Sequence, residues 1–538
     1  MSDPAPTRPD LLLLRDGDDV AVATCDLAPG DLAAPATGPG VAVRDRVPRG
    51  HKVATRDLAR GAPVRKYGQV IGVATADITA GEHVHVHNLG FEEGERRHEV
   101  GTARTVLPVP EGPRPTFRGY RRADGRVGTR NYLAIVTTVN CSASTARMIA
   151  DRFPPSALAE YPHVDGVLAL THQSGCGMIP DSEGGQLLLR TLRGYAAHPN
   201  VGAVLVVGLG CEMLPAERLA GRTFLGLPGR GAPAAPDAPD PGGLLAAIPD
   251  GTPVRSLTIQ ETGGVRATVR AGEEAVRAML PDLDRCRREE VDVSELVLGL
   301  NCGGSDGYSG ITANPALGWA SDRLVAYGGT SALAETPEIY GAEHLLTRRA
   351  VDEQVAARLL DRIDWWRRYA AAGGGSLDNN PSPGNKAGGL TTILEKSLGA
   401  VAKGGQADLA AVHGYAEPMR PHSGFVFMDT PGYDPVSVTG LVAGGATVVV
   451  FTTGRGSVFG CRPTPSIKVA TNTETYRRMT EDMDLDAGPV ADGAATVEEV
   501  GRVLFDRILA VASGAPTVSE ELGIGAEEFV PWHIGTVT

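Results

Sequence analysis

Four of the seven cysteines come directly after apolar runs, at the points where the chain turns. They lie in "TVNCS" (Cys141), "THQSGCG" (Cys176), "GLGCE" (Cys211) and "LNCGGSDG" (Cys302). The carboxyl ends of parallel strands share one edge of a sheet, so thiols that are far apart in the sequence are predicted to converge there. Thiolates bind iron and zinc well. The alternative is that these cysteines are small buried hydrophobic residues, the usual role of a lone free cysteine.

One of these loops also carries a histidine. His172 lies four residues before Cys176, and the glycines of "THQSGCG" predict a loop rather than a helix. The pair could bind Fe or Zn, and Glu212 or Asp306 would complete a mixed site with positions open for a substrate. The spacing matches no zinc-finger pattern. It therefore indicates a metal pair without identifying a known motif.

Histidines also gather near the N-terminus. "HVHVHNL" places His83, His85 and His87 at period two, on one face of a predicted strand, and "GHKVA" adds His51. Imidazole titrates near neutral pH, so these side chains are candidates for acid/base chemistry or metal binding. A solvated strand face is the alternative for the same pattern.

Three basic side chains lie in glycine-rich turns. Arg130 is in "DGRVGTRNY", Lys386 in "NNPSPGNKAGGLTT" and Arg455 in "FTTGRGSVFG". Arginine can bind a carboxylate through two nitrogens, and the backbone amides of such turns bind oxyanions. Neither "GLGCE" nor "GNKAGG" has the spacing of a dinucleotide or Walker motif, which argues against NAD and ATP.

The elements that must position these residues are predicted to form an α/β body. Apolar runs bounded by glycine alternate with helical patterns, as in "YLAIVTTV" (132–139), "GVLALTH" (166–172), "VGAVLVVGLG" (201–210) and "ELVLGLN" (295–301), and the pattern resumes at 424–432 and 445–456. Continuous apolar strands followed by helices favour parallel sheets buried on both faces. We expect two lobes, 119–285 and 286–538.

The first hundred residues have a different organisation. "CDLAPGDL", "RDLARGAPV" and "ADITAGEHV" repeat a D-[L/I]-x-x-G turn beside short alternating runs. Such a repeat predicts a compact all-β module over residues 1–96. The stretch from residue 97 to 118 carries prolines and lacks a helical period, so it is predicted to be a linker.

Composition excludes several classes of protein. A net charge of −13 over 538 residues argues against a general polyanion or nucleic-acid binder. No apolar run approaches a membrane span, and the N-terminus lacks a signal pattern, so we expect a cytoplasmic protein. Seven widely spaced cysteines make a disulfide framework unexpected. "GLPGRGAPAAPDAPDPGG" (226–243) is predicted to be a surface insertion.

Taken together, these stretches resemble the altronate and galactarate dehydratase family, the sugar-acid hydro-lyases. The matching blocks occur in order, from about residue 40 to about residue 515, and include "THQSGCG", "CGGSDGYSGITANPALG", "ETPEIYGAEHLLTRRA" and "MDTPGYDPVSVTG". The resemblance implies an N-terminal SAF-type β-clip domain, an iron-type divalent metal, and loss of water from a hexonate or hexarate. "ETPEIYGAE" and "GRGSVFG" are nearer to the altronate branch.

Dehydration of an aldonate removes a proton from C2 and expels hydroxide from C3. Both steps gain from a Lewis-acid metal, general acid/base groups and stabilisation of the developing negative charge. We therefore assign three roles. The predicted metal ligands are His172, Cys176 and Cys302, with Cys141 and Cys211 as alternates. The predicted substrate-binding residues are Arg130, Asn131, Ser305, Asp306, Lys386 and Arg455. The predicted catalytic imidazoles are His85, His87 and His51, one of which would protonate the leaving hydroxyl.

Several alternatives remain open at this point. The metal could be Fe²⁺, Mn²⁺ or another divalent ion, and the cysteines also allow an Fe–S cluster with one iron open for Lewis-acid work. The substrate could be D-altronate, giving 2-keto-3-deoxy-D-gluconate, or galactarate, and a lyase expelling sulfite from sulfolactate is chemically close. A non-enzymatic sugar-acid sensor is the competing class. The expected partner is a small sugar acid, with no nucleic acid and no membrane, and homo-oligomerisation is left open.

Overall fold

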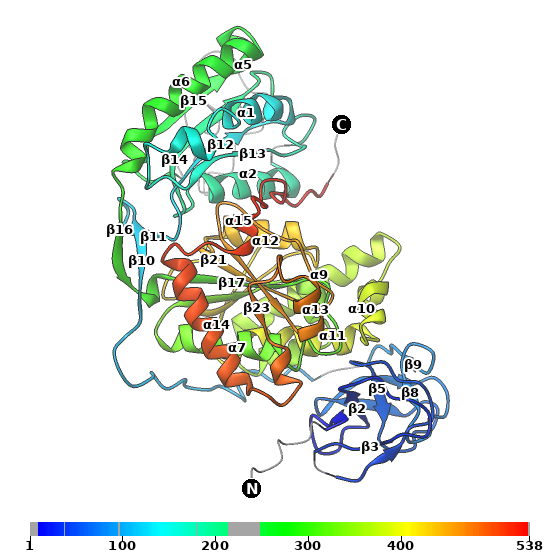
Figure 1. Ribbon diagram of the computed structural model, residues 1–538. Helices are drawn as coiled ribbons and strands as arrows, with labels where there is room; N and C mark the ends of the chain where they lie inside the picture. The colour runs from blue at the N-terminus through cyan, green and yellow to red at the C-terminus, as the bar shows by residue number, and fades with distance from the viewer. Residues whose placement is uncertain (1–8, 37, 95–96, 180, 214–247, 536–538) are drawn as a thin grey trace.

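The computed structural model describes the chain except for residues 1–8, 37, 95–96, 180, 214–247 and 536–538. The predicted surface insertion at 226–243 lies outside the described residues. Three bodies follow one another along the chain (Figure 1): an all-β module at the lower right, one α/β lobe at the top and a second α/β lobe in the middle. The predicted fold class is confirmed. No helix of the described part is long and apolar enough to cross a membrane.

The N-terminal module is built from short antiparallel strands. Its hydrophobic residues, such as Val53 and Val64, are fully buried. The repeated turns pair with one another, because Leu58 bridges Ile78 and Leu27 bridges Val47. The three sheets have the orders β1(Leu11–Leu12)-β2(Val20–Ala23)-β5(Lys52–Ala54)-β8(His83–Val84), β6(Pro63–Lys66)-β7(Gln69–Ala74)-β9(Leu89–Gly90) and β3(Leu32–Ala33)-β4(Val41–Ala42).

The predicted histidine strand is shorter than its alternating pattern indicates. β8 ends at Val84, and the next residues form a turn. Asn88 closes this turn, since its side-chain oxygen accepts from the backbone N–H of His85 at 2.9 Å and its amide donates to the carbonyl of His83 at 2.9 Å. Asparagine favours such turns because its side chain bonds to nearby backbone. His85 therefore leaves the strand direction, and His87 lies exposed on the turn.

A small antiparallel sheet connects the two lobes. β10 (Thr116–Arg121) pairs with β11 (Val127–Gly128) and with β16 (Arg288–Asp292). The segment before β10 runs along the second lobe, where the backbone N–H of Gly101 donates to the carbonyl of Thr347 at 3.2 Å. The last residues of the predicted linker thus form part of a strand.

The first lobe holds a four-stranded sheet in which every pairing is parallel. Its strand order is β13(Gly166–Leu170)-β12(Tyr132–Thr137)-β14(Val201–Gly208)-β15(Val254–Thr258). Alternate residues of β12 face two separate cores, Leu133 on one side and Ala134 on the other, as expected for a strand buried on both faces. The helices of this lobe within the described residues are α1(Ala143–Ala150), α2(Glu183–Ala196), α5(Ile259–Thr262) and α6(Val265–Asp284).

The second lobe holds a seven-stranded parallel sheet. Its order is β19(Leu409–His413)-β20(Gly424–Met428)-β18(Thr330–Leu333)-β17(Val297–Cys302)-β21(Val448–Thr453)-β22(Ser466–Ala470)-β23(Leu485–Asp486). In the sheet, β18 is the neighbour of β17 on one side, and β21, which comes later in the chain, is its neighbour on the other side. The strand order therefore reverses between β17 and β21, and ligands bind at the carboxyl end of such a switch point.

Helices cover both faces of this sheet. α7 and α14 pack together on one face, while α12 lies between the sheet and α2 of the first lobe (Figure 1). α14 begins at a capping box, in which Thr496 and Glu499 bond to each other's backbone N–H groups. The helices are α7(Ala313–Ala326), α8(Glu343–Thr347), α9(Glu353–Ala372), α10(Pro383–Ala387), α11(Ile393–Val401), α12(Asp434–Ala443), α13(Thr473–Arg478), α14(Val497–Ala512) and α15(Val518–Glu521).

Candidate active site

Two turns meet at the switch point of the second lobe. The turn after β17 and the turn after β21 are joined by backbone hydrogen bonds, because the N–H groups of Gly454 and Arg455 both donate to the carbonyl of Gly304, at 3.0 and 2.8 Å. Gly304 has a φ of +62°, a conformation that glycine adopts without strain. The two turns thus form one rigid platform at the place where the sequence predicts a ligand turn.

Asp306 holds this platform together. Its carboxylate accepts hydrogen bonds from Thr471 at 2.9 Å, from the Asn472 amide at 3.0 Å and from Ser309 at 3.0 Å. Burial nevertheless raises the pKa of Asp306 above its ordinary value. Because its oxygens are already engaged, Asp306 is better suited to shaping the turn than to binding a substrate hydroxyl. Ser305 is buried beside it, and its carbonyl accepts from Asn385 at 2.8 Å.

Two cations lie at this platform. Among the described residues, the side chains of Lys386 and Arg455 form no hydrogen bond or ion pair, and the charge of Lys386 acts on the carboxylate of Asp378. Both adjoin Gly388, since Lys386 precedes it by two residues and a Cβ at Gly388 would lie 3.2 Å from Cδ of Arg455. Lys386 is half-buried and Arg455 is exposed. The pair can hold a carboxylate, as the sequence predicts.

The N-terminal module brings three imidazoles to the same segment. Nδ1 of His51 lies 3.0 Å from Nε2 of His83, and the rings of His51 and His85 have centroids 4.8 Å apart. One nitrogen of each of the three rings lies within 4.8 Å of the others. Nε2 of His51 is 3.3 Å from the carbonyl of Ala387, the neighbour of Lys386.

Burial changes what these imidazoles can do. It lowers the pKa of His83 to about 4 and of His85 to about 3, with the neighbouring positive charge of His51 and Lys52 adding to the effect. The predicted role as general acid needs a protonated ring near neutral pH. Neutral rings fit metal ligation instead. Nδ1 of His85 is buried without a hydrogen-bond partner, an unsatisfied acceptor or donor that a cation would explain.

The predicted catalytic imidazoles therefore differ from the observed group in one member. His83 belongs to the group, although the sequence assignment named His85, His87 and His51. His87 is exposed at its edge, and its ring centroid lies 5.5 Å from that of His83. The signal for His83 was present in "HVHVH", but the turn at Asn88 could not be placed from the alternation alone.

A fully buried ion triad docks the module onto the second lobe. Glu395, on α11, accepts from Lys52 at 2.9 Å and from Lys66 at 2.9 Å, and all three side chains are 0% exposed. Lys52 also donates to the carbonyl of Gly389 at 2.6 Å. Burial favours the neutral acid, but the two ammonium groups outweigh it and hold the pKa of Glu395 well below its usual range. Burial lowers the pKa of Lys52 to about 8.

A second buried polar group lies under the platform, at the ends of β17 and β18. The Lys403 ammonium is 2.8 Å from Sγ of Cys302, and Lys396 donates to Glu338 at 2.6 Å. Burial raises the pKa of Glu335 to about 8 and of Cys302 to about 12. Cys302, Glu335 and Glu338 have metal-ligating atoms within 4.8 Å of one another. However, the two lysines already supply positive charge, which makes a cation less favourable here.

Sequence reasoning missed most of this group. Lys396 and Lys403 are seven residues apart, two turns along one helical face, and this spacing was the available signal. Glu335 has a φ of +73°, a left-handed conformation that costs free energy in a residue other than glycine. The acids lie in "ETPEIYGAE", which the sequence analysis used only for the family resemblance.

The predicted metal set of His172, Cys176 and Cys302 is divided by the fold. Cys302 ends β17 in the second lobe, whereas His172 and Cys176 follow β13 in the first lobe. Both ring nitrogens of His172 are engaged, Nε2 with the carbonyl of Thr137 at 3.0 Å and Nδ1 with the N–H of Ser174 at 3.2 Å. The error arose because strand ends converge only within one sheet, and the sequence did not show that there are two.

Arg130 and Asn131 are also in the first lobe, where Arg130 contacts helices of the second lobe and Asn131 contacts its own lobe. The Arg130 guanidinium binds both oxygens of Glu520, at 2.7 and 2.8 Å, and donates to backbone carbonyls including that of Val511. The Asn131 amide donates to the carbonyls of His163 and Leu283. We therefore leave both out of the substrate site. Cys141, Cys176 and Cys211 are exposed on the carboxyl edge of the first lobe.

Comparison with protein-family models covers nearly the whole chain. The model "Altronate/galactarate dehydratase SAF domain" matches residues 9–92. "D-galactarate dehydratase/Altronate hydrolase, second domain" matches residues 119–284, and "D-galactarate/Altronate dehydratase, C-terminal" matches residues 293–537. The three matches follow the order of the β module, the first lobe and the second lobe.

Similar proteins of known name extend over the same length. The chain is 39% identical to galactarate dehydratase (L-threo-forming) of Escherichia coli (strain K12), over 95% of this chain and 94% of that protein. It is 38% identical to altronate dehydratase of the same organism, over 94% and 95%. It is 36% identical to altronate dehydratase of Bacillus subtilis (strain 168), over 92% and 94%. The predicted resemblance is confirmed: the chain belongs to the D-galactarate/altronate dehydratase family.

Proposed function

We propose that this protein is a hydro-lyase that removes water from a sugar acid, with D-altronate as substrate and 2-keto-3-deoxy-D-gluconate as product. One observation carries the proposal. Three imidazoles of the N-terminal module, one buried and two half-buried, lie at the switch-point platform of the second lobe, beside two cations whose charged groups form no hydrogen bond or ion pair with the described residues. Anion-binding side chains next to metal-ligating side chains are what the dehydration of a hydroxy acid requires.

The imidazoles support a divalent metal at this place. Their lowered pKa values keep the nitrogens free of protons near neutral pH, and the buried Nδ1 of His85 has no other partner. His51, His83 and His85 would hold the ion, and imidazole suits Fe²⁺ and other first-row metals. When bound, a divalent ion supplies Lewis-acid polarisation of carboxylate and hydroxyl oxygens.

The chain's own residues supply binding and exclusion of water. Lys386 and Arg455 hold the carboxylate next to C2, which orients the C2 proton and stabilises negative charge that develops on the carboxylate as that proton leaves. The module closes this side of the site. Tyr308 is buried and donates from its hydroxyl to the carbonyl of Ala23 at 2.7 Å, while the Glu395 triad fixes the neighbouring strands.

Galactarate is the second candidate substrate, because the relative with 39% identity carries that name. Altronate has one carboxylate, whereas galactarate has one at each end and would need a cation for both. "ETPEIYGAE" and "GRGSVFG" favour altronate by resemblance. Lys386 and Arg455 can bind either one carboxylate together or two separately, and the substrate panel decides between the two sugar acids.

The test is a substrate panel with the full-length protein. Protein stripped of metal and reloaded with Fe²⁺ or Mn²⁺ is incubated with D-altronate, galactarate and sulfolactate, and 2-keto acid is measured over time. We expect keto acid from D-altronate without a nicotinamide or a nucleotide, and little from the stripped protein. Product from galactarate alone would replace the substrate and keep the reaction. Binding of a sugar acid without any keto acid would favour a sensor and overturn the proposal.

A further inference from the structure

A thiol and an amine that the proposed active site does not use are in contact under the platform. Nζ of Lys403 lies 2.8 Å from Sγ of Cys302, and the two residues are 0% and 2% exposed. A distance of 2.8 Å is typical of a hydrogen bond between nitrogen and oxygen. Sulfur is a larger atom than oxygen, so an amine that donates to sulfur normally lies further away. The nitrogen and the sulfur are therefore held closer together than a hydrogen bond requires.

Rigid elements hold both partners of this contact. Cys302 is the last residue of β17, inside the seven-stranded sheet. Lys403 belongs to η6 (Ala402–Gly404), a turn of 3-10 helix that follows α11 and packs against α7 and β18. The two residues are 101 positions apart in the chain, so only the folded structure brings them together.

One carboxylate lies within reach of both atoms. Oε2 of Glu335 is 3.8 Å from Sγ of Cys302 and 3.3 Å from Nζ of Lys403. Its other oxygen, Oε1, is buried and has no hydrogen-bond partner among the described residues. The neighbouring acid, Glu338, already accepts from Lys396 at 2.6 Å. Glu335 is therefore the acid of this group that can take up a further proton.

These neighbours offset the effect of burial on the thiol. Burial raises the pKa of Cys302 to about 12, and the thiolate is the reactive form of cysteine. Transfer of the thiol proton to Glu335 leaves the net charge of the group unchanged and places a thiolate against the Lys403 ammonium. Burial raises the pKa of Cys461 to about 12 as well, but its neighbour is the Tyr195 hydroxyl at 3.9 Å. Cys461 is thus a buried thiol without a lysine beside it.

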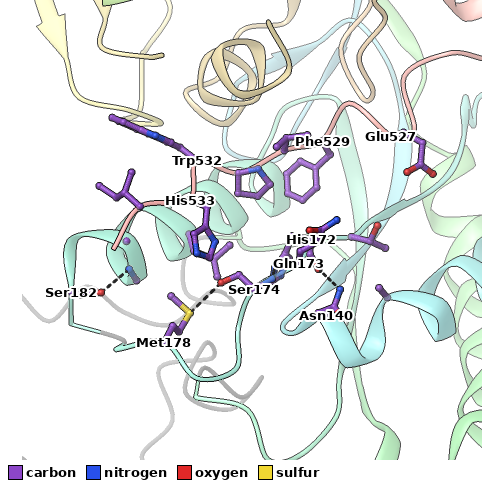
Figure 2. Close-up of a pocket in the computed structure, with 18 of the residues that line it drawn as sticks. Asn140, His172, Gln173, Ser174, Met178, Ser182, Glu527, Phe529, Trp532 and His533 are labelled. Carbon is purple, nitrogen blue, oxygen red and sulfur yellow. Dashed lines mark hydrogen bonds between the residues drawn. The ribbon is translucent and has the colours of Figure 1, made fainter. Parts of the chain in front are cut away.

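The position of the pair limits which oxidant can reach it. The cavity of about 650 Å³ between the first lobe and the C-terminal segment is lined by Asn140, His172 and His533, among others, and by neither Cys302 nor Lys403 (Figure 2). A bulky disulfide such as oxidised glutathione needs an opening of this size beside its target. Hydrogen peroxide is small enough to reach a buried thiol through brief local openings of the fold.

We propose that hydrogen peroxide joins Cys302 and Lys403 through a reversible covalent N–O–S bridge. In the first step the thiolate attacks peroxide: an S–O bond forms, the O–O bond breaks, and the leaving hydroxide takes the proton held by Glu335 and departs as water. The product is a sulfenic acid, the first stage of cysteine oxidation.

The second step forms the bond to nitrogen. The Lys403 ammonium gives one proton to Glu335, and the neutral amine nitrogen bonds to the sulfenic oxygen. Nitrogen and oxygen each lose one hydrogen to a second peroxide, which leaves as two water molecules. One amine, one thiol and two peroxides thus give one bridge and three waters. A dithiol reverses the change by returning four hydrogens, which restores the amine and the thiol and releases one water.

The bridge changes the charge beneath the platform. An amine bonded to oxygen is a weak base, so Lys403 loses its positive charge while the acids beside it remain. One of these acids, Asp434, is packed against the platform turn, because a Cβ at Gly303 would clash with its carboxylate. We therefore expect the bridged enzyme to have a lower turnover. This effect rests on the proposed function, whereas formation of the bridge does not.

The test is peptide mass spectrometry of the full-length protein, purified with a dithiol and then treated with increasing hydrogen peroxide. We expect a linked pair of peptides that contain Cys302 and Lys403, with the summed mass of both plus one oxygen and minus two hydrogens. A dithiol should separate them again. Cys302→Ser and Lys403→Arg should each abolish the link. Cys461→Ser is the matched control and should keep it, with circular dichroism confirming that the variants are folded.

Turnover is measured in parallel with enzyme loaded with Mn²⁺, so that peroxide does not act through ferrous iron. It should fall as the bridged fraction rises, recover with the dithiol, and not respond to peroxide in Cys302→Ser. The mass measurement needs no substrate, so failure of the bridge and failure of the proposed function are distinguishable. Oxidation of Cys302 to a sulfinic acid without a link, or a link that lacks the oxygen atom, would overturn the bridge. A bridge that leaves turnover unchanged would overturn its effect on the platform.

Discussion

Among single residues, the histidines show how burial decides the role of a side chain. His85 and His87 are two positions apart in one motif, yet the first has a buried nitrogen without a partner and the second is exposed. The lowered pKa of His85 keeps its ring neutral, and a neutral ring is a ligand or a base rather than an acid. The difference predicts opposite outcomes for the same substitution.

His85→Asn should lose divalent metal and reduce turnover by about 10²-fold or more, the scale of a lost catalytic group. His87→Asn, the matched control, should keep metal content and stay within a few-fold of the unchanged enzyme. Metal content by elemental analysis and turnover in the keto-acid assay measure the two effects. Equal losses in both variants would mean that the exposed turn, and not the group of His51, His83 and His85, forms the site.

Two arginines show the same dependence on surroundings. Arg455 is exposed on the platform, whereas Arg130 is buried in an ion pair with Glu520. Arg455→Ala should raise KM with metal content unchanged, because binding of the substrate carboxylate is weakened. Arg130→Ala should leave KM nearly unchanged and lower the free energy of unfolding by about 3–5 kcal/mol, since Glu520, whose side chain is 15% exposed, then keeps only its hydrogen bonds from Thr517.

Steady-state kinetics and denaturant unfolding of the two variants measure this contrast. A raised KM in folded Arg130→Ala would return that residue to the substrate site. The sequence could predict that both arginines lie in turns after or before strands. It could not show that Glu520, 390 residues beyond Arg130, forms an ion pair with Arg130 and not with Arg455.

Among the secondary-structure elements, the strands show which features the sequence could predict. The apolar runs at 132–139, 201–210 and 295–301 contain strands β12, β14 and β17, and the turn after β17 does lie at a switch point. Strand order cannot be read from such runs, so the sequence could not tell that Cys302 and Cys176 belong to different sheets. Short strands such as β18 and β22 lack a distinctive apolar run and were missed.

The contact between α11 and strands β5 and β6 gives a prediction about pH. The pKa of Glu395 is lower in the folded protein than its ordinary value of 4.5. A carboxyl group whose pKa is lower in the folded than in the unfolded protein stabilises the folded state at any pH above its unfolded-state pKa. This stabilisation is lost as the pH falls through the folded-state pKa. Docking of the module should therefore be constant from neutral pH to about 5 and weaken progressively below about 4.5.

Hydrogen exchange of β5 and β6 at a series of pH values measures this docking. Glu395→Gln provides the control, because an amide does not titrate and leaves Lys52 and Lys66 without a counter-ion. It should expose these strands already at neutral pH, with a cost of about 3–5 kcal/mol. Unchanged hydrogen-exchange protection of β5 and β6 in Glu395→Gln, or docking of the module that strengthens in acid, would contradict the role given to Lys52, Lys66 and Glu395.

In the whole molecule, the proposed active site lies between the module and the second lobe. The module would contribute the imidazoles, and the second lobe the platform with Lys386 and Arg455. The first lobe carries its own cavity and its own exposed thiols at the opposite end of the molecule (Figure 1). Sequence reasoning combined these two sets into one site, because only the folded chain shows which strand ends share an edge.

The most direct test of the account is an anomalous difference map from crystals of the enzyme loaded with Mn²⁺ and soaked with its sugar acid. The account predicts one strong peak between His51, His83 and His85, with the substrate carboxylate against Arg455 and Lys386. A peak at Cys302, Glu335 and Glu338, or a substrate bound away from the module, would contradict it.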